Sequence, residues 1–171
     1  MMKRIVVLLL AAMLVFGMVG CGTTNNGNGP TGDSQSEQDS GSLKEFKPEE
    51  LINALITGIA FTGKIEEVPA DDLEWYIDME EGVTGIMYAV SGVSSEEVAV
   101  FTAPDEKTAA QMVKNVEAML EDQLDQNAAY DSKVSQRIDN AVIEKRGCYV
   151  ILCVSDDSAK AKTIIRNAFG E

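Results

Sequence analysis

The sequence predicts an α+β fold in which helices pack on one face of a mainly antiparallel, four-stranded sheet. Residues 140–154 contain two β-branched runs around a glycine turn, and residues 83–101 contain a second pair of apolar runs around a polar turn. Apolar residues recur at helical spacing before, between and after these pairs. Two hairpins with helices between them are typical of a layered α+β domain.

The first expected helix covers residues 47–59. Pro48 suits the first helical turn because the N–H that it lacks would have no intrahelical partner there. The apolar side of this helix consists of Leu51, Ile52, Leu55, Ile56 and Ile59. Residues 61–68 are expected to form a loop.

Residues 73–79 allow two interpretations. Asp71 and Asp72 suit the start of a short helix, because a carboxylate accepts a hydrogen bond from a first-turn N–H. The Trp-Tyr-Ile run is equally typical of a strand. Trp75 and Tyr76 are candidates for a sugar- or peptide-binding platform, with a core or half-core position as the commoner alternative.

Two strands and a long helix are expected next. Residues 83–90 and 97–101 read as antiparallel strands joined by a turn. Thr102 precedes Asp105 by three residues, as the two partners of a capping box do. The apolar side of the following helix consists of Ala109, Met112, Val113, Val116, Leu120 and Leu124. The pattern then fades, and no element is assigned to residues 131–139.

The second hairpin is expected to turn at Arg146 and Gly147, because Gly adopts a positive φ without a Cβ clash. The expected cross-strand pairs are Lys145 with Cys148, Ile143 with Val150, and Ala141 with Leu152. This face is apolar away from the turn, so we assign it to the core.

The opposite face of the hairpin mixes apolar and polar side chains, namely Val142, Glu144, Tyr149, Ile151 and Cys153. We therefore expect it to be half exposed or lightly covered. The candidate binding surface consists of Val142, Tyr149, Ile151, Trp75 and Tyr76.

An amphipathic helix is expected to end the chain. The run Ser155-Asp156-Asp157 suits its start, because these side chains accept first-turn N–H groups and their negative charge suits the positive end of the helix dipole. Gly170 suits its end.

The composition limits the classes of partner. The formal charge is −14 and the chain has no histidine. An acidic chain without a basic stripe repels phosphates, so nucleic-acid binding is not expected. The absence of histidine removes the commonest general base and metal ligand.

The first 20 residues read as a secretory leader. Lys3 and Arg4 form a positive start, and Ile5 to Phe16 is an apolar run too short to span a bilayer comfortably. The ending Met18-Val19-Gly20-Cys21 resembles the lipobox of bacterial lipoproteins, although Met18 stands where Leu is more usual. The resemblance implies that Cys21 becomes the lipidated first residue of the mature protein, for example with palmitate; ordinary cleavage and release is the alternative.

The domain organisation follows from this leader. Residues 1–20 are the expected signal peptide, residues 21–42 the lipidated Cys and a flexible tether, and residues 43–171 one α+β domain. The tether is rich in Gly, Asn, Ser and Thr and lacks large apolar residues, so it cannot bury enough surface to fold. A chain of this kind has an r.m.s. span of about 25 Å.

The segments EEVAVFTA and AVIEKRGCYVILCVSDD, with the closing helix, resemble a domain of unknown function found in small lipoproteins of Gram-positive bacteria. The resemblance covers residues 73–169. It implies a lipoprotein with a compact α+β domain, and it supplies no catalytic residues.

Neither cysteines nor acids form a recognisable reactive set. Cys148 and Cys153 lie on one strand about 16 Å apart, too far for a disulfide between them. We interpret both as small core residues, with an exposed Cys153 in an intermolecular bridge as the alternative. The acidic pairs lack the spacing of an EF-hand, and no metal or cofactor is expected.

The expected function is non-catalytic. We interpret the chain as a membrane-anchored lipoprotein on the extracytoplasmic face of the cell membrane, whose domain binds an envelope protein or ligand. The alternatives are a small carboxylate-based envelope enzyme, which could depend on calcium, and a structural spacer or oligomerising module.

Overall fold

The structure, a computed structural model, describes residues 46–92, 94–127 and 132–171. Its elements are α1 (Pro48–Gly58), β1 (Ile65–Val68), the 3-10 helix η1 (Ala70–Trp75), β2 (Thr84–Val90), β3 (Glu97–Thr102), α2 (Glu106–Asn127), α3 (Ser132–Asp139), β4 (Val142–Arg146), β5 (Tyr149–Val154) and α4 (Ser158–Ala168). The α+β class is confirmed. The expected leader, Cys21 and tether lie outside the described residues.

The sheet has five strands in the order β1-β2-β3-β5-β4, and every neighbouring pair is antiparallel. The expectation of four strands is therefore wrong by one, because β1 lies in the segment assigned to a loop. Val68 is the only buried side chain of β1, while Glu66 and Glu67 are exposed. Charged residues are common on edge strands, where they discourage pairing with other chains, and they conceal the usual apolar alternation.

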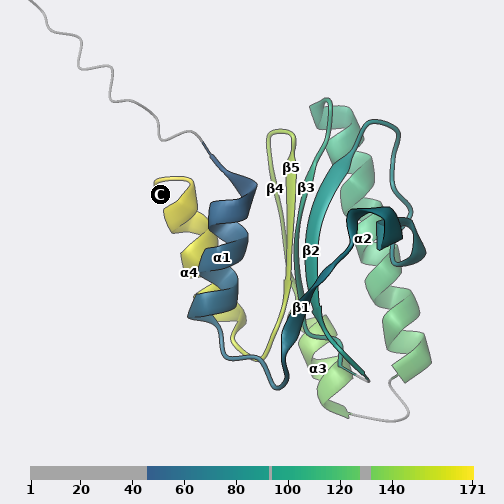
Figure 1. Cartoon of the computed structure of the whole chain (residues 1–171), viewed down its shortest axis with the longest axis vertical. Coiled ribbons are helices and arrows are strands. Elements are labelled where there is room, and N and C mark those ends of the chain that lie inside the picture. Colours follow the sequence, from purple (N-terminus) through teal and green to yellow (C-terminus); the bar gives the residue numbers. More distant parts are fainter. Residues whose placement is uncertain (1–45, 93, 128–131) are drawn as a thin grey trace, which may run out of the picture. The chain divides into compact units, whose positions relative to one another are not determined.

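Helices cover both faces of the sheet, which corrects the expectation of one covered face. Figure 1 shows α1 and α4 on one side and α2 on the other. Each side has its own apolar core, one built on α2 and η1 and the other on α1 and α4. The central strand β3 and its neighbour β5 are buried on both faces, so their sequences are continuous apolar runs rather than alternating ones.

The hairpin between β4 and β5 turns one residue later than expected. Arg146 pairs with Tyr149, so the loop residues are Gly147 and Cys148, and Gly147 has a φ of +58°. Ile143 consequently faces Leu152 rather than Val150. The cross-strand partner of Ile143 is therefore two positions further along the chain than expected. Because side chains alternate between the two faces with a period of two, every residue of the hairpin keeps the face that was assigned to it.

Two details of the helices also differ from expectation. Asp105, not Thr102, accepts the first-turn N–H of α2, from Thr108 at 2.7 Å, and Thr102 is the last residue of β3. The helix α3 lies in residues left unassigned, because only Val134 and Arg137 of this short polar helix are buried. The segment around Trp75 is helical, as the first of the two interpretations held.

Candidate functional site

The 3-10 helix η1 presents two aromatic side chains to solvent. Leu73 and Ile77 are buried in the core beneath it, and the N–H groups of Tyr76 and Ile77 both donate to the Leu73 carbonyl, at 2.9 Å and 3.1 Å. Trp75 is 86% exposed and Tyr76 is 48% exposed. These two are the exposed large hydrophobic residues of the part of the chain that the structure describes. The commoner alternative, a core or half-core position, is therefore wrong for Trp75, whereas Tyr76 is about half exposed.

Tyr76 also borders a cleft of about 300 Å³ between the β1–β2 edge of the sheet and α2. Glu66, Ala89 and Glu97 lie in register across β1, β2 and β3, so their side chains share the face of the sheet that α2 covers. Ala89 is small and stands between the two acids. Gln123 of α2 lines the opposite side of the cleft.

Glu97 is the buried acid of this cleft, with 3% of its surface exposed. The Gln123 side-chain amide donates to its two carboxylate oxygens, at 3.2 Å and 3.4 Å. Burial raises the pKa of Glu97 to about 7, and the hydrogen bond from Gln123 only partly opposes this shift. No Lys or Arg of the described residues forms an ion pair with this carboxylate. A carboxyl group with a perturbed pKa in a cleft is a candidate functional group.

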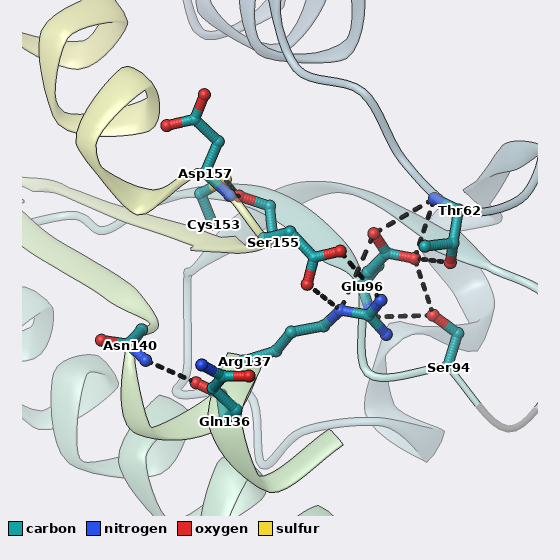
Figure 2. A network of polar contacts seen from close by, with 10 residues as sticks. Thr62, Ser94, Glu96, Gln136, Arg137, Asn140, Cys153, Ser155 and Asp157 are labelled. Carbon is teal, nitrogen blue, oxygen red and sulfur yellow. Dashed lines mark hydrogen bonds and ion pairs between the residues drawn. The ribbon is translucent and has the colours of Figure 1, made fainter. Parts of the chain in front are cut away.

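A second polar centre surrounds Glu96, the residue before Glu97 (Figure 2). The Glu96 carboxylate is fully buried and accepts hydrogen bonds from the backbone N–H and hydroxyl of Thr62 and from the Ser94 hydroxyl. Arg137 Nε lies 3.9 Å from one of its oxygens. The negative charge of Glu96 thus has a cation nearby, whereas the described residue that donates to Glu97 is the neutral amide of Gln123.

Arg137 connects this centre to the start of α4. Its guanidinium donates twice to Asp156, at 2.7 Å and 3.1 Å, and these hydrogen bonds hold the pKa of Asp156 below its ordinary value. A polar cavity of about 420 Å³ adjoins both residues. Because two carboxylates balance the charge of Arg137, we interpret this network as a structural clamp between α3, the start of β3 and the β5–α4 turn.

The hairpin part of the expected binding surface is not exposed. Val142 and Ile151 are 2% and 0% exposed, and both pack in the core built on α1 and α4. Tyr149 is half buried, and its ring meets Phe46 edge-on with 4.5 Å between centroids. The expectation that this face forms a contact surface is therefore wrong for Val142 and Ile151, because α1 and α4 cover it.

Both cysteines of the hairpin are free thiols. Cys153 is buried, which raises the pKa of its thiol to about 11, so the alternative of an exposed, bridge-forming Cys153 is wrong. Cys148 is half buried in the turn. Within the described ranges, no three acidic or cysteine side chains come together as metal ligands.

The comparisons with known proteins add a family and nothing more specific. Residues 64–155, from the start of the sheet to the end of β5, match a family model described as a domain of unknown function, DUF4358. No curated protein and no solved structure matches the chain. The matched segment contains Trp75, Tyr76, Glu97 and Gln123, so the aromatic pair and the cleft both lie in the part that the family model covers.

Proposed function

The chain belongs to the DUF4358 family, whose model matches more than half of its residues, and from that premise we propose that it is a lipid-anchored, extracytoplasmic binding module without catalytic activity. Cys21 holds it at the outer face of the cell membrane, and the surface formed by Trp75 and Tyr76 contacts an envelope protein or ligand.

The anchor is supported by the leader. A positive start followed by an apolar run is the pattern of a secretory leader, and the small residue directly before Cys21 belongs to the ending that resembles a lipobox. None of the helices in the described ranges is long and apolar enough to cross a membrane. Several acyl chains, each contributing roughly 0.8 kcal/mol per buried CH₂, would give stable attachment.

The single observation that carries the binding function is the exposure of Trp75. A Trp side chain is large and apolar, and it is commonly buried unless it contacts a partner. The buried Leu73 and Ile77 fix the backbone on either side of it, so the indole is presented from an ordered element. Rigid, exposed aromatic residues are typical anchors of binding surfaces.

The surroundings of the aromatic pair indicate the charge of the partner. Asp72, Glu74, Asp78 and Asp122 line the shallow hollows next to Trp75 and Tyr76. A cation is attracted both by these carboxylates and by the faces of the two aromatic rings. The surface therefore favours a partner with basic groups.

Metabolic labelling with an alkyne analogue of palmitate tests the anchor. We expect label on the wild-type protein in the membrane fraction, and no label on Cys21→Ser. Wild-type protein that remains unlabelled and is recovered from the cytosol would refute the anchor.

Site-specific photo-crosslinking in intact cells tests the surface. A photoreactive amino acid at position 74, beside the intact Trp75, should give a discrete adduct that is lost when Trp75→Ala is added. The same amino acid at position 117, an exposed residue of α2 away from the cleft, is the control. Identical adduct patterns from positions 74 and 117 would argue against a binding role for this surface.

A further inference from the structure

The cleft beside Tyr76 extends across the register of three strands, from Glu66 on β1 to Glu97 on β3. Neighbouring strands lie about 4.8 Å apart, so the backbones of Glu66 and Glu97 are about 10 Å apart, with Ala89 between them. Glu66 lies at the exposed edge, where Lys64 Nζ and the Ser91 hydroxyl donate to its carboxylate. Glu97 is the buried end of the row.

The Glu97 carboxylate has unused capacity for hydrogen bonds. An ionised carboxylate offers about four acceptor positions, and within the described residues the only side-chain donor to Glu97 is the amide of Gln123. A buried negative charge is costly unless a cation pairs with it. Arg137, the cation nearest to the adjacent Glu96, already pairs with that residue and with Asp156.

The form of the cleft distinguishes between kinds of cation. A divalent metal requires several oxygen ligands, usually with carboxylates among them, and within the described residues no three His, Cys, Asp or Glu side chains come together. An Arg guanidinium pairs best by bonding both carboxylate oxygens in one plane, a position that the Gln123 amide occupies. A primary ammonium is a compact charge with three rotatable donors and needs only one free direction of approach.

We propose that this cleft binds a primary ammonium group, in the form of a lysine side chain of a basic partner peptide, which pairs with Glu97 while the peptide lies against Tyr76 and Trp75. The inference rests on the proposed function, because it supplies the chemistry of the partner. Tyr76 joins the two parts of the site, since it borders both the cleft and the hollow next to Trp75.

The test uses full-length protein in detergent and the blocked tripeptide acetyl-Gly-Lys-Gly-amide. Trp75 is the single tryptophan of the chain, so its fluorescence reports binding at this surface, and calorimetry provides an independent affinity. The comparison peptides carry Nε-acetyl-lysine, which removes the charge, or arginine, which changes its shape.

Glu97→Gln and Glu117→Gln are the matched variants. Each replaces one carboxyl group with an amide, but Glu117 lies on the exposed side of α2 outside the cleft. We expect Glu97→Gln to weaken binding of the lysine peptide by at least about tenfold, and Glu117→Gln to change it by less than about twofold. The acetylated and arginine peptides should bind wild type as weakly as the lysine peptide binds Glu97→Gln.

Equal effects of the two variants, or equal binding of the three peptides, would overturn the ammonium pocket. If Trp75 still responds to peptide in Glu97→Gln with unchanged affinity, the aromatic surface binds without the cleft and the proposed function is unaffected. Absence of any calorimetric signal with wild type would overturn the pocket, while the labelling and crosslinking results would decide the proposed function separately.

Discussion

Glu96 and Glu97 are consecutive buried acids, and within the described part of the chain only Glu96 lies close to a cation. Arg137 Nε is 3.9 Å from the Glu96 carboxylate, whereas the side-chain donor to Glu97 among the described residues is the neutral amide of Gln123. The two carboxylates therefore lie in different electrostatic surroundings. The paired acid connects parts of the fold, and the other is a buried charge next to a cleft.

Removal of Arg137 should be strongly destabilising. Arg137→Met leaves the buried Glu96 carboxylate without its cation, and breaking a buried pair from one side typically costs about 3–5 kcal/mol. The free energy of unfolding from urea denaturation measures this loss. Adding Glu96→Gln to Arg137→Met should recover part of it.

Arg166→Met is the control for Arg137→Met, because Arg166 is an exposed arginine of α4. We expect it to change the free energy of unfolding by no more than about 0.5 kcal/mol. Similar losses from the two arginine variants would mean that the Glu96 network does not stabilise the fold.

The burial of Glu97 should make the protein less stable as the pH rises toward neutral. Its pKa is about 7 in the folded protein, against an ordinary value of 4.5, so between these values the folded state binds more protons than the unfolded state. The free energy of unfolding therefore decreases from about pH 4.5 to about pH 7, by on the order of 3 kcal/mol. Besides Glu97, the carboxyl groups that line the cleft are those of Glu66 and Glu67 of β1. The amide of Gln123, which does not ionise, faces the cleft from α2.

Glu97→Gln should remove this dependence, because the amide carries no charge to desolvate. Urea denaturation at pH 5 and pH 7.5 should show a smaller difference for the variant than for wild type, and a more stable variant at the higher pH. A wild-type stability that increases over this interval as much as that of Glu97→Gln would show that the Glu97 carboxylate is not desolvated.

The long periodic elements were predictable from the sequence. The elements that the sequence did not predict share a physical cause. The helices α1, α2 and α4 and the strands β2 to β5 have apolar patterns that burial imposes. The strand β1 and the helix α3 bury few side chains, so propensity and periodicity barely mark them. Their positions depend on partners that are distant in the sequence.

The candidate site was only half predictable for the same reason. Trp75 and Tyr76 stand out by residue type, but their exposure depends on Leu73 and Ile77 facing the core. Glu97 is one acid among many, at the edge of an apolar run, and Gln123, which covers it from α2, is 26 residues away in the chain. Only the register across β1, β2 and β3 reveals the cleft.

The N-cap of α4 should contribute measurably to stability. The Asp157 carboxylate accepts the backbone N–H of Lys160 at 3.0 Å, which satisfies one first-turn donor. Asp157→Ala should lower the free energy of unfolding by about 1 kcal/mol. Asp157→Asn should lower it much less, because the amide oxygen also accepts the hydrogen bond. Equal losses in the two variants would point to the charge, not the hydrogen bond.

The two hairpin cysteines should differ in reactivity. Cys153 is buried and the pKa of its thiol is raised to about 11, so little reactive thiolate forms near neutral pH. Cys148 is only half buried. A disulfide reagent should therefore modify Cys148 first in the native protein, and Cys148→Ser should abolish the fast phase. A fast phase that survives in Cys148→Ser and disappears in Cys153→Ser would contradict the burial of Cys153.

Trp75 and Leu73 provide a matched pair within η1, because they lie two residues apart and have opposite exposure. Leu73→Ala removes core contacts and should cost about 2–5 kcal/mol. Trp75→Ala removes a larger side chain but should cost no more than about 0.5 kcal/mol, because its indole is already in water. Urea denaturation followed by circular dichroism measures both. A Trp75→Ala loss as large as that of Leu73→Ala would place the indole in the fold and remove the basis for a binding surface, because a side chain that stabilises the isolated domain is not held free for a partner.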